Sequence, residues 1–184
     1  RETTVRQELK ELNGPLEEAK ADISGLWALQ QLMDKGVIDR RQESAMYVTF
    51  LASAFRTFRF GLSAAHAKGM ALQMNWLLDH GAVRIDKAGR FSLDLAQTKR
   101  AVTGLTREIM TLQGEGSYAR AKQMIDSLGV LSAPPKEVLY KLTSLPVDIE
   151  VLEFMKNSKL VPTTGGDDAD GVVRMKSFAD PTRR

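Results

Sequence analysis

Three acidic side chains, Glu17, Glu18 and Asp22, are the residues of this chain best suited to chemistry. At about 3.6 residues per helical turn, Glu18 and Asp22 lie one above the other, while Glu17 points about 100° around the axis. Ala21 and Gly25 continue the Glu18 stripe and are small enough for another segment to approach the carboxylates. The pattern suits a metal ligand with supporting acids. The alternative is a solvated helix face, because acidic residues are almost never buried unpaired.

Two stretches of the sequence resemble a known family of enzymes. Residues 16–22 resemble the Glu-Glu-x-x-Ala-Glu/Asp motif of the dipeptidyl-peptidase III-like zinc metallopeptidases, peptidase family M49. Residues 22–29 resemble the bacterial and plant branch of that family, which is sometimes fused to a Nudix domain. Residues 58–69 form a second matching block, and the likeness extends from about Thr4 to about Leu131.

The resemblance implies a role for each of four residues. Glu18 would be a zinc ligand, Glu17 would support it from outside the ligand set, and Asp22 would accept a hydrogen bond from a zinc-binding histidine. Such outer acids fix the tautomer of a ligand histidine. His66 would line the cleft and hold the substrate carbonyl as its oxyanion forms. The implied activity is zinc-dependent peptide hydrolysis, with Zn²⁺ as the cofactor of the intact protein.

The chain has too few suitable zinc ligands to form a catalytic zinc site by itself. Such a site uses three His, Cys or carboxylate ligands and a water. The chain has no cysteine and two histidines, His66 and His80. On one helix these would lie about 21 Å apart at a rise of ~1.5 Å per residue. Relatives carry the other ligands and the general-base glutamate on an earlier His-Glu helix, so we expect a C-terminal fragment that alone neither binds zinc tightly nor hydrolyses peptides.

The sequence departs from the family pattern at several positions. Ala19, Lys20 and Asp22 stand where relatives can have Cys, Arg and Glu, and Met70 stands where peptidases have an arginine. The missing arginine leaves the mode of peptide binding open. Without the resemblance, His66 could equally cap or pack near a helix start.

Bulk composition excludes several other classes of protein. The 184 residues carry a net charge of +3, too small for a nucleic-acid binder. No apolar run reaches the ~18 residues of a membrane span. The absence of cysteine fits a reducing compartment, and we expect a cytoplasmic location. The expected partners are the N-terminal part of the same polypeptide, a peptide substrate, and a second copy through exposed apolar surface.

The elements that must position these residues are mostly helices. We expect a mainly α domain over residues 1–161, with one β-hairpin, and a flexible tail over residues 162–184. A helix to about Leu12 is expected to break at residues 13–15, followed by the helix that carries the acids. Further helices are predicted at 41–60, 63–80, 95–113, 117–128, 136–144 and 148–157, and the hairpin strands at Val83/Ile85 and Phe91/Leu93.

Two non-enzymatic interpretations remain beside the peptidase. One is a non-catalytic relative whose helical unit acts as a scaffold. The other is a self-standing helical interaction module, which would expose no apolar face, whereas the enzyme interpretation predicts a bare surface around Glu18 and His66.

Overall fold

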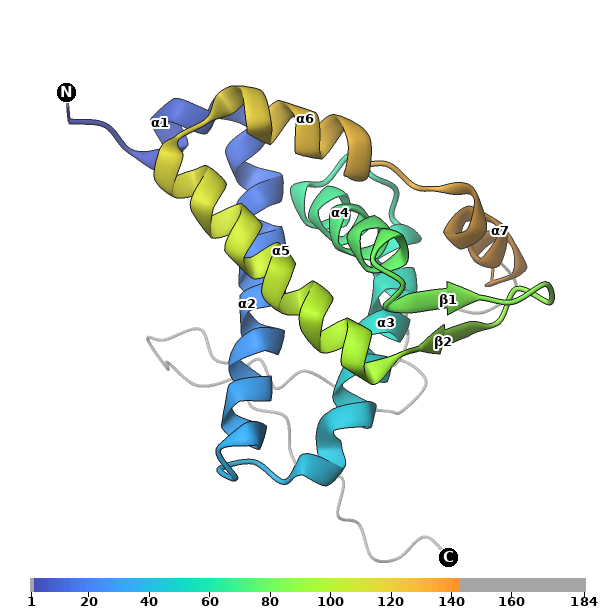
Figure 1. Cartoon of the computed structure of the whole chain (residues 1–184). Coiled ribbons are helices and arrows are strands. Elements are labelled where there is room, and N and C mark those ends of the chain that lie inside the picture. The colour runs from blue at the N-terminus through green and yellow to red at the C-terminus, as the bar shows by residue number, and fades with distance from the viewer. Residues whose placement is uncertain (1, 143–184) are drawn as a thin grey trace, which may run out of the picture. The chain divides into compact units, whose positions relative to one another are not determined.

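The computed structural model describes residues 2–142, and the helix expected at 148–157 and the tail expected from 162 lie outside them. These residues belong to one unit, Arg1–Leu145. The described residues are mostly helical, with one two-stranded hairpin at the edge of the helices, which confirms the mainly α class (Figure 1). The elements are α1 (Val5–Leu9), a 3₁₀ turn (Lys10–Leu12), α2 (Asn13–Asp34), a second 3₁₀ turn (Arg40–Gln42), α3 (Glu43–Phe58), α4 (Ala65–Asp79), β1 (Val83–Ile85), β2 (Phe91–Leu93), α5 (Leu95–Glu115), α6 (Tyr118–Leu128) and α7 (Ala133–Lys141).

The start of α2 corrects one expectation about the chain. Thr4 caps α1 with a capping box that it shares with Gln7. The break then falls at Lys10, which has a φ of 52°, and not at residues 13–15. Asn13 is the first residue of α2. Pro15 fits this first turn because its missing N–H would have had no partner inside the helix.

Helix α2 forms the spine of the fold and packs on both α4 and α5 (Figure 1). Its buried side chains recur every three or four residues, as expected for a helix with one face in the core. They are Pro15, Leu16, Ala19, Ile23, Leu26, Gln30 and Met33. Trp27, four residues after the buried Ile23, is nevertheless 38% exposed. This buried stripe sets the rotation of α2 and therefore the direction in which its acids point.

The hairpin has the predicted strands. Val83 pairs with Leu93 and Ile85 with Phe91 in antiparallel register. Asp86 closes the turn, and its Oδ1 accepts hydrogen bonds from the backbone N–H groups of Ala88 (2.8 Å) and Arg90 (3.0 Å). Among the described residues, no helix is long and apolar enough to cross a membrane.

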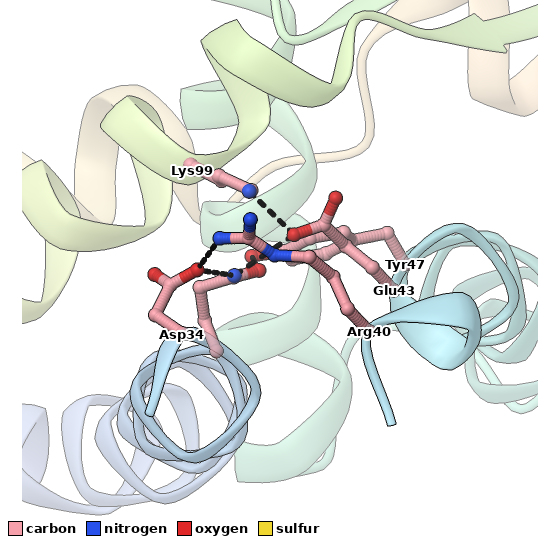
Figure 2. A network of polar contacts seen from close by, with 6 residues as sticks. Asp34, Arg40, Glu43, Tyr47 and Lys99 are labelled. Carbon is pink, nitrogen blue, oxygen red and sulfur yellow. Dashed lines mark hydrogen bonds and ion pairs between the residues drawn. The ribbon is translucent and has the colours of Figure 1, made fainter. Parts of the chain in front are cut away.

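A network of polar side chains ties the end of α2 to α3 and α5 (Figure 2). The buried Tyr47 hydroxyl donates to Gln30 Oε1 at 3.0 Å, and Gln30 Nε2 donates to Glu43 Oε1 at 2.8 Å and to Asp34 Oδ1 at 3.1 Å. Lys99 pairs with Glu43, and Arg40 pairs with Asp34. Burial raises the pKa of Tyr47 to about 12.

The two carboxyl groups of this network predict a loss of stability in acid. Burial opposes the charge of Glu43, but hydrogen bonds from Lys99 and Gln30 outweigh it and lower its pKa. The hydrogen bond from Arg40 likewise lowers the pKa of Asp34. A group whose pKa is lowered by folding stabilises the protein above its unfolded pKa, about 4, and this stability is lost as pH falls through the lowered value.

We therefore expect the thermal midpoint of the protein to fall as pH is lowered from 6 through about 4 towards 3. Glu43→Gln should make that fall shallower, because this group no longer takes up a proton on unfolding. Glu137→Gln, at an exposed position of α7, is the matched control and should leave the slope unchanged. Identical pH profiles of the Glu43→Gln and unmodified proteins would contradict this account.

Candidate functional site

Glu18 on α2 faces His66 in the first turn of α4. The Nδ1 atom of His66 lies 3.0 Å from Glu18 Oε2, and both side chains are about half exposed, 46% for His66 and 47% for Glu18. A carboxylate only accepts hydrogen bonds, so Nδ1 carries the proton and Nε2 is left to interact elsewhere. The structure thus brings together the two residues given the leading roles by the sequence.

Asp22, one turn after Glu18 on α2, also contacts α4. Its Oδ2 accepts a hydrogen bond from Gln73 Nε2 at 3.2 Å. Gln73 follows His66 by seven residues, which is two helical turns, and so lies on the same face of α4. Glu18 and Asp22 therefore make two successive contacts along α2, to His66 and to Gln73, as their spacing predicts.

Glu17 points in a different direction, toward α5. Its Oε1 accepts from Gln113 Nε2 at 2.7 Å, and Lys20 Nζ lies 2.7 Å from its Oε2. The predicted rotation of Glu17 away from the Glu18 stripe is therefore observed. Glu17 and Asp22 each accept a hydrogen bond from a glutamine amide of another helix, and Glu18 contacts an imidazole.

Gly69 permits the close contact between α2 and α4. A Cβ at this position would lie 2.7 Å from the backbone oxygen of Pro15, 3.0 Å from the backbone nitrogen of Ala19 and 3.3 Å from Glu18 Cβ. The first distance is shorter than real Cβ contacts, and the second is tighter than most of them, so a side chain here would push the two backbones apart. The close approach expected at Gly25 is not seen in residues 2–142, where a Cβ on Gly25 would meet nothing within 4 Å. The small residue that brings helices together at the acids is Gly69.

The donors present fit one zinc ligand and do not form a whole site. Glu18 is accessible, acidic and fixed in direction by His66. Among the described residues, no three His, Cys, Asp or Glu side chains form a group able to hold a metal ion. The second histidine, His80, lies at the other end of α4, where its Nδ1 is 2.8 Å from the Trp76 carbonyl oxygen and its ring stacks on that indole. It is remote from Glu18, as the spacing predicts.

Sequence reasoning missed two residues that contact the acids, Gln73 and Gln113. Gln73 could have been found from its two-turn spacing to His66. Gln113 carries no local signal, because its partner Glu17 lies 96 residues earlier in the chain. Met70 stands where peptidases have an arginine, and here it is 4% exposed and packs in the core.

A hollow of about 220 Å³ lies between α5 and α6, and neither Glu17, Glu18 nor Asp22 lines it. Its walls are Glu108, Arg120, Gln123, Met124, Ser127 and Leu128. Arg120 is already paired with Glu108 and Glu115. Glu18 and His66 therefore lie half exposed on α2 and α4 and not in this hollow.

Comparison with known proteins shows what the chain is similar to. No family model matches the chain. It is 42% identical over 149 residues to Nudix hydrolase 3 of Arabidopsis thaliana, a match that covers 81% of this chain and 19% of that protein.

Two solved structures share both the fold and the sequence. Dipeptidyl-peptidase III from Corallococcus sp. strain EGB is 50% identical with a TM-score of 0.77, over 80% of this chain and 28% of that one. DPP III from Caldithrix abyssi is 38% identical with a TM-score of 0.80, over 85% of this chain and 30% of that one. The chain thus spans less than a third of the length of each of these three proteins. These matches confirm the resemblance: the chain is a relative of one part of dipeptidyl-peptidase III.

Proposed function

We propose that this chain contributes Glu18 as a zinc ligand and His66 as a substrate-binding donor to a dipeptidyl-peptidase III-like peptide hydrolase. The observation that carries the proposal is the pairing of Glu18 and His66 across α2 and α4. Their 3.0 Å contact fixes the direction of a carboxylate that remains half exposed. Both solved relatives named above carry the name of this peptidase.

The remaining zinc ligands would come from outside residues 2–142, because the described part of the chain holds no three-ligand group. When bound, zinc supplies Lewis-acid activation of a water and of the scissile carbonyl. Glu18 would bind the ion through a carboxylate oxygen. Asp22 and Glu17 would remain outside the ligand set, where carboxylates orient imidazole ligands and raise their basicity.

His66 would act on the substrate and not on the metal. With Nδ1–H directed at Glu18, its Nε2 is available at a half-exposed position. When protonated, Nε2 donates a hydrogen bond to the carbonyl oxygen of the peptide, and a donor aimed at the developing oxyanion contributes a few kcal/mol, about 3, to catalysis. Met70, one helical turn after His66, carries no positive charge. Binding of the peptide would therefore depend on other residues.

The test is zinc binding by the full-length protein that contains this chain. Glu18→Ala should lower zinc affinity by at least about 100-fold, because losing a direct ligand should exceed the 10–100-fold cost of losing an outer partner. Peptide hydrolysis should fall with it. Zinc affinity is measured by chelator competition, and the matched control is Asp126→Ala, which removes an exposed carboxylate paired with Lys122 on α6.

Unchanged zinc affinity in Glu18→Ala would remove Glu18 from the ligand set. A full-length protein without stoichiometric zinc would favour the alternative function, a non-catalytic helical scaffold related to the peptidase.

The match to Nudix hydrolase 3 adds the proposal that a Nudix domain lies in the same full-length polypeptide. Sequencing the upstream coding region tests it.

A further inference from the structure

Gln73 has an environment that is unusual for a buried glutamine. It lies in α4 with no exposed surface. Its Nε2 donates to Asp22 Oδ2 at 3.2 Å and to the Gly69 carbonyl oxygen at 3.3 Å. Both neighbours of this nitrogen are acceptors, so exchanging the amide nitrogen and oxygen would set oxygen against oxygen. The orientation of the Gln73 amide is therefore fixed, with the nitrogen toward Asp22.

The other end of the same amide is unsatisfied. Gln73 Oε1 is buried and has no hydrogen-bond partner among the described residues. A buried acceptor without a donor destabilises a folded protein, and an apolar side chain of the same length would avoid that cost. Core packing alone does not account for a glutamine here. On the side of the acids, Gln73 makes one contact that an apolar residue could not make, its hydrogen bond to Asp22.

We infer that Gln73 is a positioning residue for the zinc site, acting through Asp22. The amide holds Asp22 by Oδ2 and leaves Oδ1 to accept the ring N–H of a histidine that binds the metal. The amide brings no cation to Asp22, and a carboxylate is a strong hydrogen-bond acceptor. This inference rests on the proposed function of Glu18 and Asp22, and it adds a residue that contacts neither metal nor substrate.

The arrangement of α2 and α4 gives the amide little freedom. Gly69 brings the α4 backbone against Pro15 and Ala19, and its carbonyl oxygen takes the second hydrogen bond of Gln73. Gln73 is thus held within its own helix while it reaches across to Asp22. A shorter or purely apolar side chain would leave Asp22 free to rotate on its half-buried position.

The experiment compares zinc affinities of full-length variants by chelator competition. Gln73→Met keeps the length of the side chain but removes the donor, and we expect about tenfold weaker zinc binding, the lower end of the range for outer partners. Asp22→Asn should also weaken binding. Adding Gln73→Met to Asp22→Asn should change the affinity by less than about threefold, because the two residues act through one contact.

The control and a second variant protect this test from folding effects. Gln30→Met makes the same change at another buried glutamine, 4% exposed in the network with Tyr47, and should leave zinc affinity unchanged. If Gln73→Met does not fold, Gln73→Leu replaces it. Leucine is also apolar and cannot donate a hydrogen bond to Asp22, so the same loss of zinc affinity is expected.

The outcomes separate this inference from the proposed function. Weaker zinc binding in Gln73→Met that disappears in the Asp22→Asn background supports the positioning role. Wild-type affinity in Gln73→Met, or a loss that adds fully to that of Asp22→Asn, overturns it even if Glu18→Ala abolishes binding. Retention of zinc in Glu18→Ala overturns the ligand assignment and the positioning role together.

Discussion

Replacing Gly69 by alanine is expected to lower the free energy of unfolding by about 3 kcal/mol, at the upper end of the cost of overpacking a core. In the interior of an ordinary helix the same change would stabilise by about 1 kcal/mol. The reversal arises because the new methyl group would lie 2.7 Å from Pro15 O and 3.0 Å from Ala19 N. Both are backbone atoms of α2, so neither can rotate away. The helices must separate instead.

Thermal or denaturant unfolding measures this effect, and a shift of the midpoint on the order of 10 °C is expected for a chain of this size. Gly25→Ala is the matched control on α2, where the added methyl group meets nothing within 4 Å. It should leave stability unchanged or raise it by about 0.5–1 kcal/mol. Equal effects of the two substitutions would show that Gly69 does not set the spacing between α2 and α4.

The separation of α2 from α4 in this variant should also disturb the contact between His66 and Glu18. Gly69 lies one turn from His66, and its missing side chain leaves room beside Glu18 Cβ. Gly69→Ala should therefore lengthen the contact between His66 and Glu18 and weaken zinc binding by the full-length protein. A variant that is destabilised but binds zinc with unchanged affinity would uncouple the packing of these helices from the site.

Replacing Asn75 by leucine is expected to cost about 3 kcal/mol, because two carbonyl groups lose their donor at once. The Asn75 Nδ2 donates to Leu128 O at 2.8 Å and to Val130 O at 2.7 Å. These carbonyls belong to the last residue of α6 and the segment after it. The Asn75 side chain, 7% exposed, thus links α4 to the end of α6 through hydrogen bonds.

Denaturant unfolding measures the loss of stability. Asn75→Asp tests whether that loss comes from the missing hydrogen-bond donor or from the changed shape of the side chain. Aspartate has nearly the same size but presents only oxygens to the two carbonyls, so it should destabilise at least as much as leucine. A fully tolerated Asn75→Asp would show that packing and not hydrogen bonding accounts for this position. From the sequence alone, Asn75 has no role beyond packing.

Much of the local structure follows from the sequence because its signals are local. The strands of the hairpin lie where alternating Val83, Ile85, Phe91 and Leu93 predict them. The bounds of α5 and α6 agree with their predicted ranges to within two residues. The break before α2 is misplaced, because residues 13–15 are also compatible with a first helical turn and no local rule identifies Lys10 as the residue with positive φ.

The sequence by itself determined which groups can do chemistry here and how they are spaced on one helix. Helical periodicity alone turns Glu18 and Asp22 to one side and Glu17 to another. Only the tertiary structure decided what meets them. Gln73 and Gln113 lie 51 and 96 residues from the acids they hold, so their roles depend on how α4 and α5 pack on α2. That packing depends in turn on Gly69, where one hydrogen atom in place of a side chain lets two backbones meet.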